Sequence, residues 1–197
     1  MWLFLGQVED QDVRLFLSSF QLTRFVAWDR VGVAGAIMAT RAAAMFDPHV
    51  DIPRLAHNLP ILRGRRREYS SAASKIAIFA RPQDPIYIWD RLARKAARHR
   101  DWVRGGRTGP KYLGRNYGNE DGHDYPAFWR VCDAARREER EKADFQQAYA
   151  RLILDFRNGA GGDVMADPAT TPDHFIERRL LDKLMVWEGM LLEGQPI

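Results

Sequence analysis

A lysine and an aspartate frame one short segment of the chain, and aromatic residues lie close to both. Lys75 stands in the apolar run 74–80, and Asp90 follows the two-proline turn 81–85. A lysine amine becomes a nucleophile when burial or a nearby cation disfavours its protonated form, and Arg81 could supply that cation. A carboxylate beside it can stabilise a developing sugar cation, as in glycoside cleavage.

The elements that must position these two residues are a pair of helices joined at the turn. Apolar spacing predicts a helix over 72–80, capped by a serine, and a second helix over 86–103. Two such helices can bring Lys75 and Asp90 together, but the spacing does not require it. A surface lysine and an acid at a helix N-terminus would explain the same pattern.

The rest of the chain also reads as helical. Helices are expected over 10–20, 23–45 and 52–59, from Tyr125-Pro126 onward, over 133–156, and after an N-cap at Thr171. No alternating strand pattern and no internal repeat is present. The sequence therefore predicts an all-α fold, with residues 1–197 forming a single globular domain of about seven helices. Residues 104–124 are expected to form a mobile basic loop, with disorder as the alternative.

Composition sets the class of protein. The 197 residues are 46% hydrophobic and 28% charged, which is typical of a globular protein. The single cysteine, Cys132, excludes a disulfide framework and fits a cytoplasmic location. No stretch reaches the roughly 18 apolar residues of a membrane span, and we expect no signal peptide. The histidines are too scattered to predict a metal site, and no cofactor is expected.

Positive charge is concentrated in the middle of the sequence. Residues 63–115 contain 15 Lys/Arg and four acids, a local charge of +11, whereas the remainder carries −7. This favours a polyanionic partner such as nucleic acid, although a solvated arginine-rich helix is the alternative. The candidate phosphate contacts are Arg63, Arg65, Arg66, Arg67, Arg91, Arg94, Arg98, Arg107 and Lys111.

The central segment also resembles a known family. Its pattern Ser-Lys-x3-Phe-x2-Pro-x2-Pro-Ile-x2-Trp-Asp, over 74–90, resembles a block in bacterial proteins similar to 8-oxoguanine DNA glycosylase, within the helix-hairpin-helix DNA glycosylases. Residues 179–187 resemble the Arg…Asp…Leu-Trp segment with which such proteins often end. The resemblance implies a helix-hairpin-helix glycosylase-like fold and a DNA N-glycosylase, possibly with lyase activity.

The resemblance also assigns roles. Lys75 matches the lysine that attacks the sugar C1′ and forms a Schiff base, and Asp90 matches the acid that stabilises the sugar cation. The implied partner is double-stranded DNA with a flipped, modified base, bound by a monomer. Repair and attack on foreign DNA both remain open, as does the base excised. The candidates for stacking on the flipped base are Phe79, Tyr87, Trp89 and Tyr112, with core packing as the alternative for Phe79 and Trp89.

Two other functions fit parts of the sequence. Arg94 and His99 form an Arg-x4-His pattern that resembles the motif of the all-α HEPN ribonucleases, in which both residues act on the scissile phosphate. A nucleic-acid-binding module without catalysis would use the same basic middle.

Overall fold

The computed structural model describes residues 7–23, 27–63, 69–106, 125–158 and 171–194. Within these ranges it has eight α-helices and one two-stranded sheet, so the predicted all-α fold is confirmed. The elements in chain order are α1 (Asp10–Ser19), β1 (Ala27–Trp28), α2 (Arg30–Ala42), α3 (Pro48–Asn58), β2 (Ile61–Arg63), α4 (Ser70–Ala80), α5 (Arg91–Arg104), α6 (Tyr125–Arg140), α7 (Ala143–Arg157) and α8 (Asp173–Leu191). No helix in the described ranges is both long enough and apolar enough to cross a membrane.

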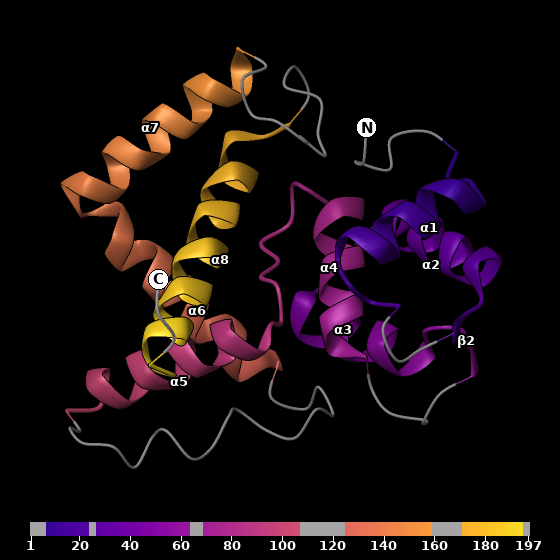
Figure 1. The fold of residues 1–197 in the computed structure, drawn as a ribbon, viewed down its shortest axis with the longest axis horizontal. Coiled ribbons are helices and arrows are strands. Elements are labelled where there is room, and N and C mark those ends of the chain that lie inside the picture. The colour runs from indigo at the N-terminus through magenta and orange to yellow at the C-terminus, as the bar shows by residue number, and fades with distance from the viewer. Residues whose placement is uncertain (1–6, 24–26, 64–68, 107–124, 159–170, 195–197) are drawn as a thin grey trace.

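The helices form two groups that share one core. Figure 1 shows α1–α4 on one side and α5–α8 on the other, with segment 81–90 running between them. Phe79 of α4 lies against Phe175 of α8, with ring centroids 5.9 Å apart. His49 of α3 packs against Trp129 of α6 at 4.5 Å. These contacts belong to a continuous hydrophobic core, as one globular domain requires.

The small sheet was not expected from the sequence. β1 pairs antiparallel with β2, and Trp28 lies opposite Ile61. The helix predicted over 23–45 is therefore shorter, because α2 begins only at Arg30 and ends at Ala42. Gly32 lies within α2, and a Cβ there would come within 2.8 Å of Pro60. The missing side chain thus lets the chain leading into β2 approach the helix.

Helix α3 begins earlier than the helix predicted over 52–59, so its two prolines lie at other helix positions than expected. Pro53 was expected to open a helix, but α3 begins at Pro48 and Pro53 lies inside it. Asp47 is the N-cap, and its carboxylate accepts a hydrogen bond from the His49 amide at 2.9 Å. Pro48 is tolerated in the first turn because that position has no intrahelical donor to lose.

The segment between α4 and α5 is extended where a helix was predicted. α5 begins at Arg91, not at residue 86. Pro82 and Pro85 disfavour helical backbone in the residues before them, and the β-branched and aromatic side chains that follow favour an extended chain. Side chains satisfy the extended backbone: the amides of Tyr87, Ile88 and Trp89 donate to Tyr125, Asp182 and Ser74, respectively.

The helix predicted over 133–156 is two helices. α6 starts at Tyr125 as expected but continues to Arg140, and α7 begins at Ala143. Lys142 between them has an extended backbone, and its amine pairs with buried Glu139 at 2.8 Å. Gln146 donates to the Arg140 carbonyl at 2.6 Å, which satisfies part of the α6 C-terminus. At the last helix, the N-cap is Pro172 rather than Thr171, a one-residue difference.

Candidate active site

Lys75 is the only charged residue of α4, a helix whose side chains are almost all buried. Such a helix packs against neighbours on every side, so its lysine cannot reach solvent freely. The Lys75 ammonium lies over the ring of Phe20, 5.6 Å from its centroid. Phe20 is the C-cap residue of α1, so Lys75 extends from the α4 core toward the end of α1.

Asp90 stands at the start of α5, directly after the extended segment. It is the N-cap of α5, and its Oδ1 accepts a hydrogen bond from the Leu92 amide at 2.8 Å. The alternative explanation, an acid at a helix N-terminus, is therefore correct for its structural role. Capping α5 uses only the Oδ1 atom of Asp90, so Oδ2 can face another group.

A buried hydrogen bond joins the residues next to Lys75 and Asp90. The hydroxyl of Ser74, which is fully buried, accepts from the Trp89 amide at 2.9 Å and donates to the Ser71 carbonyl at 3.2 Å. Because Ser74 precedes Lys75 and Trp89 precedes Asp90, this bond fixes the start of α5 beside α4. The two predicted residues thus lie on adjoining segments, close enough for the Asp90 carboxylate to act electrostatically on Lys75.

Removing this hydroxyl should be costly. We expect Ser74→Ala to lower the free energy of unfolding by about 1–3 kcal/mol, because it leaves the buried Trp89 amide without its acceptor. Ser19→Ala, at an exposed serine of α1, is the control and should change stability by less than about 0.5 kcal/mol. Urea unfolding of both variants measures the difference, and equal effects would show that the Ser74 hydrogen bond does not stabilise the fold.

The surroundings of Lys75 favour the neutral amine. Burial lowers the pKa of Lys75 below its usual value, since a charged amine loses hydration in the protein interior. The carboxylate of Asp90 opposes this effect, and the guanidinium of Arg179 adds to it. Lys75 therefore has an enlarged neutral fraction near neutral pH, as a nucleophilic amine requires.

Arg179 and Asp182 of α8 complete the site, and neither was assigned a role from the sequence. Arg179 Nη1 pairs with Asp182 Oδ2 at 2.8 Å, and its guanidinium lies over the Phe79 ring at 5.7 Å. Burial raises the pKa of Asp182 to about 6, although Arg179 opposes the shift. Because Glu177, Arg178 and Lys183 are charged as well, the sequence of α8 did not single out Arg179 and Asp182.

Arg81 does not supply the cation that we expected beside Lys75. Its guanidinium pairs with Asp84 and donates to the carbonyls of Thr40, Arg41 and Ala43. These carbonyls belong to the C-terminal end of α2, where a cation offsets the negative end of the helix dipole. Arg81 therefore anchors the turn to α2. The cation that acts on Lys75 is Arg179, not Arg81.

The aromatic residues proposed for base stacking are largely core residues. Phe79, Tyr87 and Trp89 have at most 3% of their surface exposed, so the stacking role predicted for them is wrong in this conformation. Tyr87 donates its hydroxyl to Asp133 at 3.1 Å, and Trp89 packs against Phe128 with centroids 5.1 Å apart. Core packing, the alternative for Phe79 and Trp89, describes them correctly. Tyr112 lies outside the described residues.

The predicted phosphate contacts have different environments. Arg91 is exposed but forms a two-point ion pair with Glu193, which Lys95 also contacts at 3.2 Å. Arg94 is buried with its guanidinium over Trp89, 4.9 Å from the ring centroid, so the prediction of an exposed phosphate contact there is wrong. Arg98 is half-buried. Arg65, Arg66, Arg67, Arg107 and Lys111, and the side chain of Arg63, lie outside the described residues.

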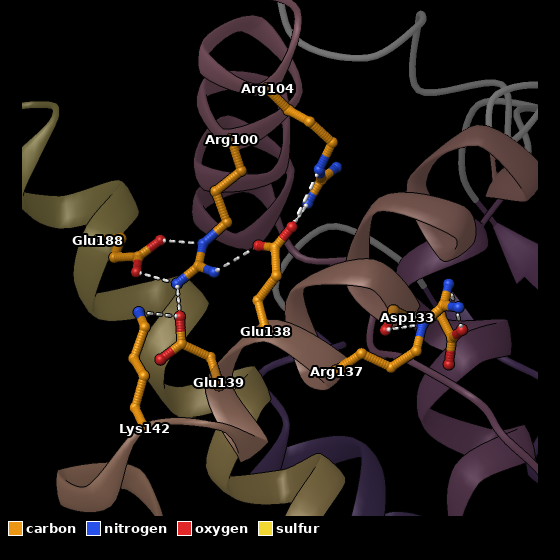
Figure 2. Close-up of polar contacts among 8 residues, drawn as sticks. All are labelled: Arg100, Arg104, Asp133, Arg137, Glu138, Glu139, Lys142 and Glu188. Carbon is orange, nitrogen blue, oxygen red and sulfur yellow. Dashed lines mark hydrogen bonds and ion pairs between the residues drawn. The ribbon is translucent and has the colours of Figure 1, made fainter.

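Much of the positive charge of α5 is neutralised within the fold. Figure 2 shows Arg100 pointing from α5 toward Glu188 of α8 and toward Glu138 and Glu139 of α6. The Arg100 Nη2–Glu139 Oε1 distance is 2.7 Å, and Arg104 Nη2 lies 2.7 Å from Glu138 Oε1. The concentration of arginines seen in the sequence therefore serves, in this helix, mainly to join α5 to its neighbours.

The two residues of the Arg-x4-His pattern do not share a site. Arg94 packs on Trp89, whereas His99 lines a pocket of about 510 Å³ together with Arg100, Val103 and Leu191. Residues five apart in a helix point about 140° away from each other. The geometry of this chain thus lends no support to the ribonuclease hypothesis.

Comparison with known proteins gives no relative. No protein-family model, no curated protein and no solved structure matches this chain.

Proposed function

We propose that the chain is a DNA glycosylase, with or without lyase activity, that uses Lys75 as its nucleophile and Asp90 as the carboxylate beside it. The observation that carries the proposal is a mostly buried lysine of lowered pKa, the only charged residue of α4 and within electrostatic range of Asp90. An ordinary surface lysine would be protonated and solvated, and an ordinary core helix would have no lysine. The resemblance of segment 74–90 to DNA glycosylases is the second support.

The proposed reaction needs a neutral amine and a nearby negative charge. The Lys75 Nζ lone pair forms a bond to the sugar C1′, while the bond from C1′ to the base breaks and the base leaves with the electron pair and takes up a proton. Asp90 stabilises the positive charge that develops on the sugar. Loss of a proton from the amine and opening of the sugar ring give a Schiff base. Water can then release the sugar, or loss of the 3′ phosphate can cut the strand.

The substrate in this proposal is double-stranded DNA with one nucleotide turned out of the stack. The glycosidic bond is inaccessible within a duplex, so the enzyme must extrude the target nucleotide to reach C1′. Lys75 of α4 lies over Phe20 at the end of α1, and the charges of Asp90 at the start of α5 and of Arg179 in α8 act on it. The proposal includes a helix-hairpin-helix glycosylase-like fold, a monomer and a cytoplasmic location, which the single cysteine supports.

A strand-cleavage assay tests this function directly. End-labelled duplexes, each with one 8-oxoguanine, uracil, alkylated purine or abasic site, are incubated with the purified full chain and then analysed with and without alkali. We expect the chain to excise the damaged base from at least one of these duplexes. The excision is detected because alkali converts the resulting abasic site into a strand break. Breaks without alkali would add lyase activity. Salt-sensitive binding with no cleavage of any duplex would contradict the proposal and favour a non-catalytic binding module.

A further inference from the structure

Two cations of the site lie on one pair of aromatic rings. Lys75 is 5.6 Å from the centroid of Phe20, and Arg179 is 5.7 Å from the centroid of Phe79. The two rings are themselves in contact, with centroids 5.2 Å apart. Lys75 and Phe79 are also one turn apart on α4, on the same face of the helix. The two rings thus form an apolar connection between a lysine of α4 and an arginine of α8, and the charge of Arg179 acts on Lys75.

We propose that Arg179 is a positioning residue that keeps the Lys75 amine in its neutral, nucleophilic form. This inference rests on the proposed function, in which Lys75 attacks the sugar. Arg179 does not touch the reacting atoms in this account. It acts through Lys75, because a fixed positive charge nearby makes protonation of the amine less favourable.

Asp182 holds Arg179 in that position. Its Oδ2 accepts from Arg179 Nη1 at 2.8 Å, and its Oδ1 accepts from the Ile88 amide at 3.3 Å. One carboxylate therefore ties Arg179 to the extended segment that ends at Asp90. Asp182 is almost fully buried, which restricts the movement of the arginine it holds.

The charged groups acting on Lys75 have opposite signs. Burial lowers the pKa of Lys75 most; Asp90, at the start of α5, raises it, and Arg179, from α8, lowers it by the smallest of the three effects. The contact from α1 is the uncharged Phe20. Removing Arg179 should therefore shift the titration of Lys75 to higher pH, and removing the charge of Asp90 should shift it to lower pH.

The test measures the reactivity of Lys75 without DNA. The folded full chain is treated with acetic anhydride for a short time at pH 6 to 11, and acetylation of each lysine is quantified by mass spectrometry. In Arg179→Met, we expect the rate at Lys75 near pH 7.5 to fall roughly three- to tenfold and the profile to move to higher pH. Arg179→Lys should restore most of the wild-type profile, and Asp90→Asn should move it the other way.

Lys142 is the internal control. It is exposed between α6 and α7, and its reactivity should be the same in every variant. Exposure of Lys75 would also raise its pKa, so Arg179→Lys and Arg179→Gln are compared: a merely structural role would affect Lys75 alike in both, whereas the charge effect should shift its profile only in Arg179→Gln. If Arg179→Met is poorly folded, Arg179→Gln provides the same loss of charge with a side chain that can still hydrogen-bond Asp182.

An unchanged Lys75 profile in Arg179→Met or Arg179→Gln would overturn the inference, even if the enzyme excises bases. A shifted profile would support it, even if no DNA substrate is cleaved. The two failures are thus distinguishable, because acetylation reports the amine and strand cleavage reports the reaction.

Discussion

Replacing Asp90 with asparagine should reduce base excision roughly a hundredfold to a thousandfold and leave the stability of the fold almost unchanged. The Asp90 carboxylate has two roles that this substitution separates. Asparagine is as good an N-cap as aspartate, so the hydrogen bond to the Leu92 amide can persist. The negative charge that would stabilise the sugar cation is lost. Single-turnover excision rates and urea unfolding measure the two effects separately.

Asp90→Ala is the matched control for this prediction. It removes both the charge and the cap, so it should lose the same activity and also about 1 kcal/mol of stability. An Asp90→Asn variant that retains wild-type excision would show that Asp90 only caps α5. The proposed role of this residue in the reaction would then be wrong.

Replacing Gly189 with alanine should destabilise the fold by about 3 kcal/mol, the largest stability effect we expect from a single methyl group. A Cβ at this position of α8 would lie 2.2 Å from the carbonyl oxygen of Leu92 in α5. The obstacle is backbone, which cannot rotate away as a side chain can. The helices would have to separate, and the start of α5, where Asp90 lies, would move away from α4 and α8.

Gly35→Ala provides the opposite control. Gly35 lies exposed within α2, and a Cβ there would meet no atom within 4 Å. Alanine should therefore stabilise the protein by about 0.5–1 kcal/mol, as expected from helix propensity alone. Urea unfolding of both variants should give changes of opposite sign. Unchanged stability in Gly189→Ala would contradict the packing of α5 against α8 described above, and loss of stability in Gly35→Ala would contradict the open surroundings of Gly35.

The sequence predicted some helices closely. The expected helices over 10–20 and 72–80 agree with α1 and α4 to within two residues at each end. Prediction failed where tertiary contacts replace local ones. Residues 86–89 are extended because Tyr125, Asp182 and Ser74, which lie elsewhere in the chain, satisfy their amides. No local pattern shows such partners.

The candidate site was predictable only in part, for the same reason. Lys75 and Asp90 stood out because their types and spacing suggested chemistry, and the fold places them within electrostatic range of each other. Arg179 belongs to a helix about 100 residues further along the chain, so its proximity to Lys75 could not be read from spacing. The positive charge of α5 suggested a polyanionic partner, but part of it is neutralised within the fold. Arg100 pairs with Glu188, 88 positions away, and no local pattern shows such a partner.

The most direct test of the account is to trap the proposed Schiff base and locate it. The wild-type chain, Lys75→Ala and Lys183→Ala are incubated with lesion-containing and abasic duplexes in the presence of borohydride, which reduces a Schiff base to a stable amine. We predict a covalent protein–DNA adduct for wild type and Lys183→Ala, attached to Lys75 by peptide mass spectrometry, and none for Lys75→Ala. An adduct of equal yield in Lys75→Ala, or attachment at another lysine, would contradict the assignment of Lys75 as the nucleophile.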